Sequence, residues 1–458
     1  VQLKQAAVII NGGIALFAGI NLYRGNEKFY DEIAMPLLHF LPPETAHNLS
    51  IKLAKFKIVP RVQTLDPPSL KTVVWGRSFP NPIGLAAGFD KHAEGIDGLL
   101  KMGFGFVEVG SVTPKPQPGN PKPRLFRLDE DKAVINRYGF NSVGHDIVYH
   151  RLSQRFMQVD NPGYQQTYLT DKRNLLNIDF WTDTDMEGEE THHHHYQTHW
   201  SSVHVLNNRK HYRRKANGIV GVSLGRNTIS PSPLDDYVKG VRRFGRVADY
   251  LVVNISSPSI QGLRDMHRQE ELTLLLHKVK DERDNLMVTP KPALLVKISP
   301  DLSDNEKKNI ADVITRPHCR VDGLIVCNTT VSRPTSLRSK LKKEPGGLSG
   351  EPLKAKALET IRDMYKLTQG QVPIIGVGGV SSGQDAYDKV KAGACLIQVY
   401  TALVFHGPPV ISKIKREMAE LLRRDGFNHI SEAVGADTKQ GQTQHESSRH
   451  EHQMLHPH

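Results

Sequence analysis

The chain has 458 residues, enough for one large domain with additions or for two or three domains. Hydrophobic residues make up 38% of it and charged residues 24%, so a packed globular core is expected. The net charge is +12, but the basic residues are scattered without interleaved aromatics, which favours a membrane surface or an organelle address over nucleic acid. Only three cysteines occur, without CxxC spacing, which excludes a disulfide framework and an iron–sulfur cluster.

The amino-terminal segment is apolar. Residues 6–22 carry no charge and are flanked by Lys4 and Arg24. This length is near the lower limit for a membrane-spanning helix, and two asparagines weaken the pattern. A cleaved signal peptide is the alternative, but no small-residue cleavage site precedes a polar segment. We therefore expect a transmembrane anchor over residues 1–25.

Two amphipathic segments follow the expected anchor. Phe29, Ile33 and Leu37 share one face of the first segment, and the second, after two prolines, also gathers its apolar residues on one stripe. Two ordinary helices packed on a core would show the same pattern. The alternative is a helical hairpin over residues 26–66 that lies in the bilayer interface and forms a mouth for a lipid-soluble ligand. His47 would then lie near that mouth.

Short apolar runs recur from residue 83 onward, each ending in small or polar residues and followed by a helical pattern. There are eight such runs: residues 83–87, 106–109, 219–224, 250–253, 294–298, 323–326, 373–377 and 395–399. They predict an α/β fold, a parallel (β/α)8 TIM barrel over residues 67–430, with a doubly wound open sheet as the alternative. Eight repeats suit closure, and no GxGxxG follows the first strand. Residues 72–79 resemble a hairpin that closes the barrel bottom.

The carboxyl ends of these runs would meet at one face of the barrel. Gly378 and Gly379 follow the seventh run, and Gly350 lies in the sequence GGLSG. Glycines allow backbone N–H groups to approach a ligand closely, and a helix that starts there favours an anion. The pattern predicts a phosphate cradle late in the barrel.

Several polar side chains would share that face. Lys91 and Lys297 follow or lie in apolar strands, where a lysine requires an anionic partner such as a phosphate, a carboxylate or the N1–C2=O region of a reduced flavin. Asn136, Asn254 and Asn328 carry amides that both donate and accept. This set suits a flat heterocycle with an amide edge.

Nine motifs, in one order, carry a family resemblance. They are AAGFDK, VEVGSVTPKPQPGNPKPRLFRL, INRYGFNS, ADYLVVNISSP, VKISPDL, DGLIVCNTTVSRP, GGLSG, VPIIGVGGVSSGQDA and YTALVFHGP. From about residue 26 to residue 426, apart from one insertion, the chain resembles dihydroorotate dehydrogenase. The serine of SSP and the amino-terminal extension are similar to class 2, the membrane-associated enzymes that reduce quinone. The soluble class uses a cysteine base and lacks the hairpin.

The resemblance implies the oxidation of (S)-dihydroorotate to orotate in pyrimidine biosynthesis, with FMN as hydride acceptor and ubiquinone as final acceptor. It implies that Ser257 takes the C5 proton. Implied substrate contacts are Lys91, Asn136, Arg137, Tyr138, Gly139, Phe140, Asn254, Ser259, Asn328 and Thr329. Implied FMN contacts are Ala86, Ala87, Gly88, Ser111, Ser223, Asn254, Lys297, Cys327, Gly350, Gly379, Tyr400 and Thr401. The implied quinone tunnel includes His47, Arg127 and Tyr400. The same resemblance implies a monomer in the inner mitochondrial membrane, without a metal ion or nucleic acid.

Three positions depart from the family pattern. Ser223 and Ser259 stand where asparagine is usual, and Cys327 stands where threonine or serine is usual. Each change loses or weakens hydrogen bonds, which concerns substrate affinity rather than the assignment. Two other functions remain open: a soluble-type relative that uses fumarate or NAD, and a membrane-tethered binding scaffold that has lost its chemistry.

Two segments interrupt or end the expected barrel. Residues 160–217 are polar, with four consecutive histidines at 192–195, where the family has a short connection. Adjacent histidines on one loop rarely form an ordered metal site without Cys or Asp partners, so a solvated insertion is expected, entering at the amino-terminal face of the barrel. The tail, residues 431–458, is rich in polar residues, and disorder is expected there.

Overall fold

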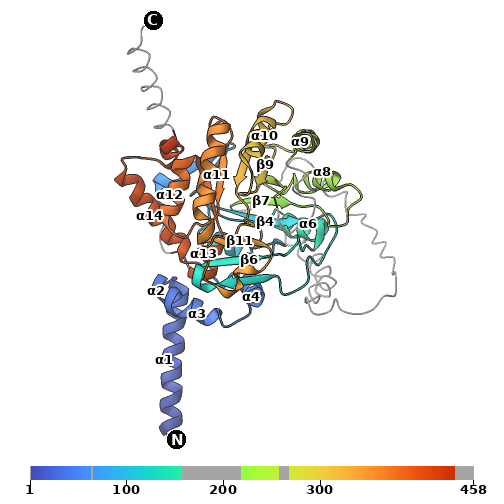
Figure 1. Ribbon diagram of the computed structural model, residues 1–458. Helices are drawn as coiled ribbons and strands as arrows, with labels where there is room; N and C mark the ends of the chain where they lie inside the picture. The colour runs from blue at the N-terminus through green and yellow to red at the C-terminus, as the bar shows by residue number, and fades with distance from the viewer. Residues whose placement is uncertain (1, 63–64, 157–217, 257–267, 439–458) are drawn as a thin grey trace, which may run out of the picture. The chain divides into compact units, whose positions relative to one another are not determined.

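The computed structural model describes residues 2–62, 65–156, 218–256 and 268–438. Within these residues, eight parallel strands close into a barrel in the order β10-β12-β13-β3-β4-β7-β8-β9 (Figure 1). Their bounds are β3 Ile83–Leu85, β4 Phe106–Val112, β7 Ile219–Leu224, β8 Tyr250–Asn254, β9 Ala293–Ile298, β10 Gly323–Val326, β12 Ile374–Val377 and β13 Ala394–Val399. Every predicted strand is confirmed, and closure excludes the open sheet.

Helices pack around these strands, as Figure 1 shows. They are α5 Ile96–Lys101, α6 Gly144–Gln154, α8 Pro233–Phe244, α9 Gln269–Asp284, α10 Asp304–Thr315, α11 Lys354–Leu367, α12 Gly383–Ala392, α13 Thr401–His406 and α14 Val410–Arg424. Local sequence fixes two of the starts. Ser303 accepts from the backbone N–H of Glu306, whose carboxylate accepts from Ser303 in return, and Ser382 pairs with Asp385 in the same way.

A hairpin closes one end of the barrel, as predicted. It consists of β1 (Thr72–Val74) and β2 (Arg77–Phe79). Phe79 packs into the apolar core with Phe106 and Tyr250, and the Trp75 indole N–H donates to the Asp322 carbonyl at 2.7 Å. This end of the barrel interior is therefore filled with side chains, and the other end remains for a ligand.

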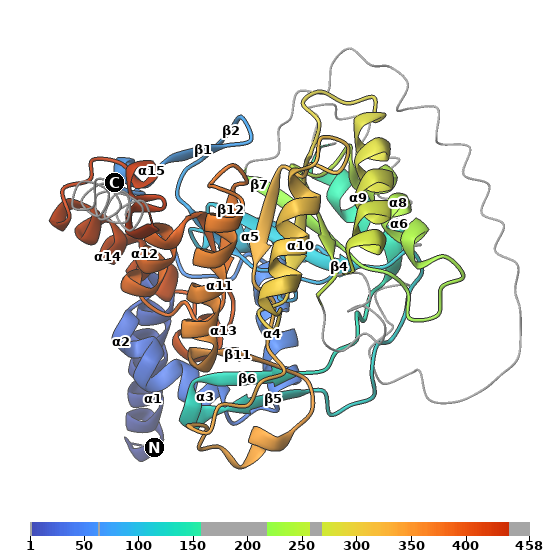
Figure 2. The same ribbon diagram turned by 45° about the horizontal axis from the view of Figure 1, so that its top comes forward.

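An antiparallel sheet that the sequence did not reveal lies at the other end, opposite the hairpin in Figure 2. It pairs β5 (Leu125–Leu128), β6 (Ala133–Asn136) and β11 (Gly347–Gly350) in the order β11-β6-β5. Its small core contains Leu128, Ile135 and Leu348. The sheet carries Arg127, Asn136 and Gly350, which the sequence analysis named as site residues.

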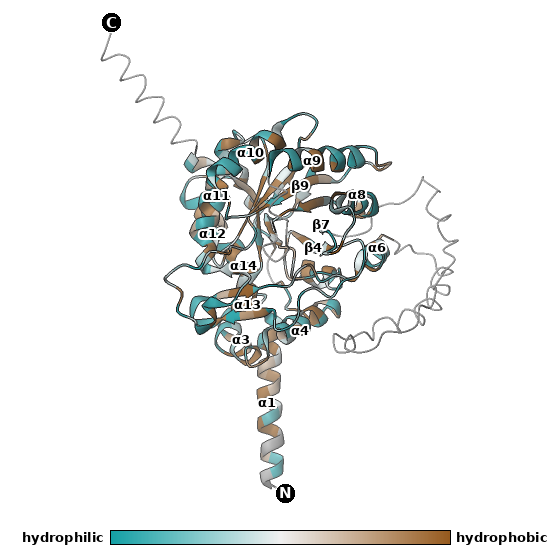
Figure 3. Cartoon of the chain, turned by 45° about the vertical axis from the view of Figure 1, so that its right-hand side comes forward, coloured by the Kyte–Doolittle hydropathy of each residue, from teal (hydrophilic) through white to brown (hydrophobic). Residues whose placement is uncertain are grey.

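The amino-terminal segment forms the expected helices. They are α1 Gln2–Arg24, α2 Glu27–Phe29, a π-helical turn Tyr30–Ala34, α3 Met35–Leu38 and α4 Pro43–Lys55. The chain from Lys4 to Arg24 is long and apolar enough to cross a membrane, and Figure 3 shows its apolar colouring. In the hairpin, Phe40 is 85% and Phe56 69% exposed, whereas Ala54 is fully buried against α5. The hairpin thus has one face on the barrel and keeps large apolar side chains exposed.

The described residues bear on two of the expected domain boundaries. The expected insertion at residues 160–217 lies outside the described residues. Residues 431–438 were expected to be disordered, but they are ordered. Ala433 of α15 (Ile430–Ala433) is fully buried, and the backbone N–H of Gly435 donates to the Val390 carbonyl. The ordered part of the barrel unit therefore passes the expected end at residue 430. Residues 439–458 lie outside the described part.

Candidate functional site

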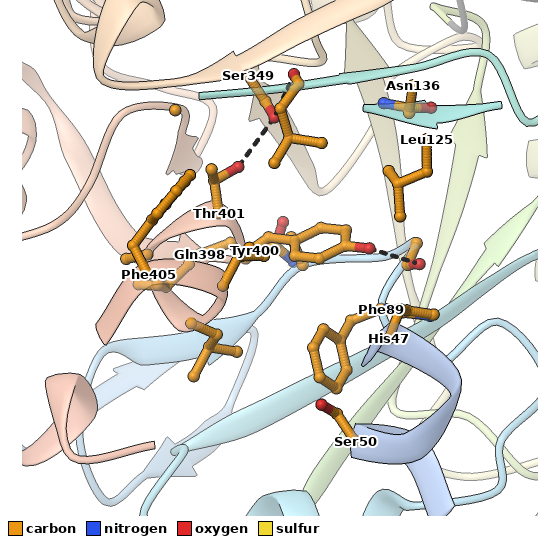
Figure 4. A pocket seen from close by; sticks show the side chains of 18 of the residues that line it. His47, Ser50, Phe89, Leu125, Asn136, Ser349, Gln398, Tyr400, Thr401 and Phe405 are labelled. Carbon is orange, nitrogen blue, oxygen red and sulfur yellow. Dashed lines mark hydrogen bonds between the residues drawn. The ribbon is translucent and has the colours of Figure 1, made fainter. Parts of the chain in front are cut away.

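A cavity of about 410 Å³ opens at the carboxyl ends of the barrel strands, within the size range of small-molecule and cofactor sites. Its walls continue from the strand ends along α13 to the amino-terminal hairpin, where His47 and Ser50 face Phe89 and Tyr400 (Figure 4). Most of its lining is apolar, although lysine and asparagine side chains gather at the barrel end. One cavity thus joins the predicted polar site to the predicted mouth.

Most of the sequence-predicted site residues line this cavity. They are His47, Ala86, Ala87, Gly88, Lys91, Ser111, Arg127, Asn136, Tyr138, Gly139, Phe140, Asn254, Lys297, Cys327, Asn328, Thr329, Gly350, Gly379, Tyr400 and Thr401. Arg137 is not among the lining residues, because its guanidinium pairs with Glu344 at 2.7 Å and lies over the Phe126 ring. Ser257 and Ser259 lie outside the described residues.

A chain of hydrogen bonds crosses the floor of the cavity. Ser223 does not line the cavity, but its Oγ lies 2.8 Å from Ser111 Oγ, which accepts from Asn254 Nδ2 at 2.8 Å. Asn254 Oδ1 accepts from the Ser256 N–H and hydroxyl at 3.3 Å, and Asn328 Nδ2 donates to Ser256 Oγ at 3.1 Å. These partners fix which way the Asn254 amide points, so its ligand contacts are set before a ligand arrives.

Lys297 provides a buried cation at the same floor. Burial lowers the pKa of Lys297, while the charge of Glu108 works in the opposite direction. Glu108 is fully buried beneath it, and accepts from Tyr250 Oη at 3.1 Å and from Gln398 Nε2 at 2.6 Å. Burial raises the pKa of Glu108. Lys297 also lines the cavity, so its side chain can act on a ligand bound there.

Lys91 is held at one side of the cavity by contacts that the sequence did not reveal. Its Nζ lies 3.0 Å from the centre of the Tyr138 ring and donates to Asn141 Oδ1 at 2.5 Å. The preceding Asp90 fixes the turn by accepting from the backbone N–H groups of Glu94 and Gly95. Asn141 also lines the cavity, so it joins the polar set. The only signal in the sequence was its position in the motif INRYGFNS.

The predicted phosphate cradle has the backbone for its role. Gly350, Gly378 and Gly379 have φ angles of 95°, 104° and 69°, which favour glycine. A Cβ on Gly379 would lie 2.6 Å from Lys354 Cα, and one on Gly350 would lie 2.3 Å from the Lys132 carbonyl oxygen. The backbone can therefore approach a ligand where a side chain would not fit. These glycines, with Lys297 and the asparagine floor, fit a ligand that carries a phosphate.

The apolar part of the cavity begins at an aromatic cluster. The His47 ring lies 5.2 Å from that of Phe89, which packs edge-on against Tyr400 at 5.4 Å (Figure 4). Burial lowers the pKa of His47 to about 3, and the charge of Lys91 lowers it further. His47 is thus neutral near pH 7 and offers one donor and one acceptor in an apolar wall.

Comparison with known proteins decides the family. The sequence profile described as "Dihydroorotate dehydrogenase" matches residues 69–422. The chain belongs to the dihydroorotate dehydrogenase family. It is similar to the mouse protein "Dihydroorotate dehydrogenase (quinone), mitochondrial", with 47% identity over 435 residues, covering 94% of this chain and 96% of that one. A "Dihydroorotate dehydrogenase (quinone)" of the bacterium Xanthobacter autotrophicus is 45% identical over 410 residues, with coverage of 89% and 99%.

Solved structures of the dihydroorotate dehydrogenase family agree. The crystal structure of the Eimeria tenella enzyme in complex with ferulenol is similar, with a TM-score of 0.71 and 39% identity, covering 87% of this chain and 96% of that one. The quinone-dependent names of the relatives place the chain in class 2 of the family. Two departures from the family pattern are now located: Ser223 hydrogen-bonds to Ser111, and burial raises the pKa of Cys327 to about 12, so its thiol stays neutral.

Proposed function

We propose that this protein oxidises dihydroorotate to orotate, with FMN as the hydride acceptor and a membrane quinone as the final electron acceptor, in pyrimidine biosynthesis. The observation that carries the proposal is the single cavity that runs from the strand ends of the barrel to the amino-terminal hairpin. A polar end suits a charged heterocycle and a phosphate-bearing cofactor, and an apolar end suits a lipid-soluble acceptor. The relatives named "(quinone)" support the same acceptor.

Different residues along the cavity would bind the substrate and the flavin. Lys91 provides a cation for the substrate carboxylate, and the amides of Asn254 and Asn328 match the ring's amide edges. Bound FMN would supply a flat ring that accepts the hydride. Lys297 lies where it can stabilise negative charge on that ring, and Gly379 leaves room for the phosphate.

Proton removal is assigned to Ser257, by its place in the SSP motif. A serine hydroxyl is a poor base alone, and no His or Asp lies in the motif. Ser257 would therefore pass its own proton to water or to a neighbouring hydroxyl as it accepts one. The neighbouring Ser256 is buried, and its hydroxyl is engaged by both Asn254 and Asn328, so it serves to orient those amides.

The membrane assignment rests on α1 and the exposed apolar side chains of the hairpin. We place the protein in the inner mitochondrial membrane, since the mouse and Arabidopsis thaliana relatives are named mitochondrial. The apolar end of the cavity is bordered by Leu22 at the end of α1 and by Leu53 of α4. A quinone dissolved in the bilayer would therefore reach the cavity between these helices.

A visible spectrum tests the proposal. The purified protein should be yellow, dihydroorotate should bleach the flavin absorbance without oxygen, and a short-chain quinone should restore it. A colourless protein that does not bind added FMN would favour the alternative of a membrane-tethered binding scaffold without catalytic activity. Reoxidation by fumarate or NAD, but not by the quinone, would favour the soluble-type reading.

A further inference from the structure

One ion pair joins the amino-terminal hairpin to the segment that precedes β5. Glu44 lies in the first turn of α4, and its Oε1 accepts from Nη2 of Arg124 at 2.8 Å and from Nε at 3.1 Å. The side chains of Glu44 and Arg124 are 17% and 4% exposed, so solvent screens this pair only weakly. Two N–H groups of one guanidinium thus converge on one carboxylate oxygen, which fixes the orientation of Arg124.

Arg124 in turn holds the backbone around Tyr138. Its Nη1 donates to the carbonyl oxygens of Pro118 and Asn120 at 2.7 and 3.1 Å. The backbone N–H of Asn120 donates to the Tyr138 carbonyl at 2.9 Å. The backbone N–H of Arg137 donates to the Arg124 carbonyl at 2.9 Å. Arg124 therefore connects the hairpin to the segment that contains Tyr138.

The ring of Tyr138 lies close to two cations. The Lys91 ammonium is 3.0 Å from the centre of the ring, and the Arg124 guanidinium carbon is 5.1 Å from it. Both cations are attracted by the ring, but they repel each other. Because Glu44 pairs with Arg124, its negative charge offsets this repulsion. Glu44 therefore affects Lys91 both through the packing around Tyr138 and through its charge.

We propose that Glu44 is a positioning residue for the substrate. It does not line the cavity, but through Arg124 and Tyr138 it sets the position of Lys91, the cation assigned to the substrate carboxylate. This inference rests on the proposed function, because it takes Lys91 to bind dihydroorotate. His47, one turn after Glu44 on α4, lines the apolar wall of the same cavity. The hairpin thus supports substrate binding as well as forming the apolar wall.

Glu44→Gln tests the proposal, because the substitution keeps the side-chain length and an acceptor oxygen but removes the charge. The Kd of orotate, measured by isothermal titration calorimetry on the flavin-loaded protein, should rise about 3- to 10-fold, part of what one hydrogen bond to a charged group contributes. The KM for dihydroorotate should rise by the same factor. The rate of flavin reduction at saturating dihydroorotate should not change, because the lost interaction acts on binding. The KM for a short-chain ubiquinone should not change either.

Glu27→Gln is the matched control. Glu27 lies in the first turn of α2, and its two carboxylate oxygens accept from Nη1 and Nη2 of Arg416 on α14 at 2.9 and 3.2 Å. It is a second glutamate–arginine pair between the hairpin and the barrel, and neither residue lines the cavity. Glu27→Gln should keep the orotate Kd of the unmutated protein. Glu44→Asp, which retains the charge but is shorter by one methylene group, should give an orotate Kd between those of the unmutated protein and Glu44→Gln.

Three results would overturn the role of Glu44. The first is an unchanged orotate Kd in both Glu44→Gln and Glu44→Asp. The second is an equal rise of the Kd in Glu27→Gln, which would assign the effect to hairpin docking in general. The third is an equal rise of the KM for the quinone, which would indicate a general loosening of the cavity. An unmutated protein that binds no orotate and is not reduced by dihydroorotate would contradict the proposed function instead.

Discussion

Gln398 donates a hydrogen bond of 2.6 Å from Nε2 to Oε2 of Glu108 inside the barrel, and neither Oε1 of Glu108 nor the amide oxygen of Gln398 has a hydrogen-bond partner there. A proton on Glu108 would give the pair a donor that it lacks, which agrees with the pKa of Glu108, raised by burial. The carboxyl beneath Lys297 is thus expected to be neutral.

Glu108→Gln should remove a pH dependence of stability. Below about pH 4.5, the ordinary pKa of a glutamate, the Glu108 carboxyl is protonated in both folded and unfolded chains. Above it the unfolded chain releases the proton first, so the unmutated protein loses stability as pH rises toward the folded pKa. Glu108→Gln has no such proton to lose. The difference in the free energy of unfolding, Glu108→Gln minus the unmutated protein, should therefore increase with rising pH by up to about 1.4 kcal/mol per pH unit in that range.

Chemical denaturation of the flavin-free protein at a series of pH values measures this difference. The exposed Glu359 provides the control, and Glu359→Gln should show a difference that does not change with pH. If Glu108→Gln were destabilised more strongly as the pH rises, Glu108 would be ionised in the folded protein. In that case Lys297 and Glu108 would form a buried ion pair, and the neutral-carboxyl account of the cavity floor would be wrong.

Ser257→Ala should keep FMN bound but slow flavin reduction by dihydroorotate at least about 10²-fold, the scale of general-base catalysis. Stopped-flow spectroscopy of the loaded protein measures the rate. Ser256→Ala is the matched control: it removes one hydroxyl from the Asn254–Asn328 network and should cost no more than about tenfold. A larger loss in Ser256→Ala than in Ser257→Ala would transfer the base role to Ser256.

Deletion of residues 160–217 should leave turnover with dihydroorotate and quinone unchanged. The strand that follows this segment begins at Ile219, which packs into the core at the hairpin end of the barrel, away from the cavity. A short Gly-Ser linker between residues 159 and 218 makes the deletion. A large fall in kcat, with FMN content preserved, would show that the insertion takes part in catalysis.

Deletion of residues 2–20 should release the protein from membranes without affecting flavin reduction by dihydroorotate. The deletion stops before Leu22, which lines the cavity, and before Tyr23, whose carbonyl accepts from the Arg61 N–H at 2.9 Å. Sedimentation with vesicles and stopped-flow reduction measure the two effects. Continued membrane binding at the same strength would assign the anchoring to the hairpin face that carries Phe40 and Phe56.

The sequence predicted the parts of the fold whose signal is local. Each barrel strand is a continuous apolar run ended by small residues, so the eight strands were identified from these runs, and the hairpin from the run that precedes the first strand. The sheet β5–β6–β11 was not: β5 and β6 form a local hairpin that was overlooked, whereas β11 joins it by pairing Leu348 with Ile135, far apart in the chain. Pairing at such separation leaves no local pattern.

The site residues also divide into those that the sequence predicted from local motifs and those that depend on tertiary contacts. Most residues that the motifs named line the cavity, but Arg137, expected at the substrate, pairs with Glu344 instead. Glu108, Gln398 and Asn141 were missed because each lies in a segment whose neighbours already explained it as strand or turn. Side-chain direction in an irregular segment depends on tertiary contacts, which the sequence does not display.

The sheet β5–β6–β11, which the sequence did not predict, carries residues proposed for both the oxidation of dihydroorotate and the reduction of quinone. Arg127, on β5, and Asn136, on the paired β6, both line the cavity, and under the proposed function they would contact the quinone and the substrate respectively. The distance between donor and acceptor sites is therefore set by a ribbon with its own core of Leu128, Ile135 and Leu348. On heating, electron transfer through the protein should fail when this ribbon frays, while the barrel beneath it is still folded.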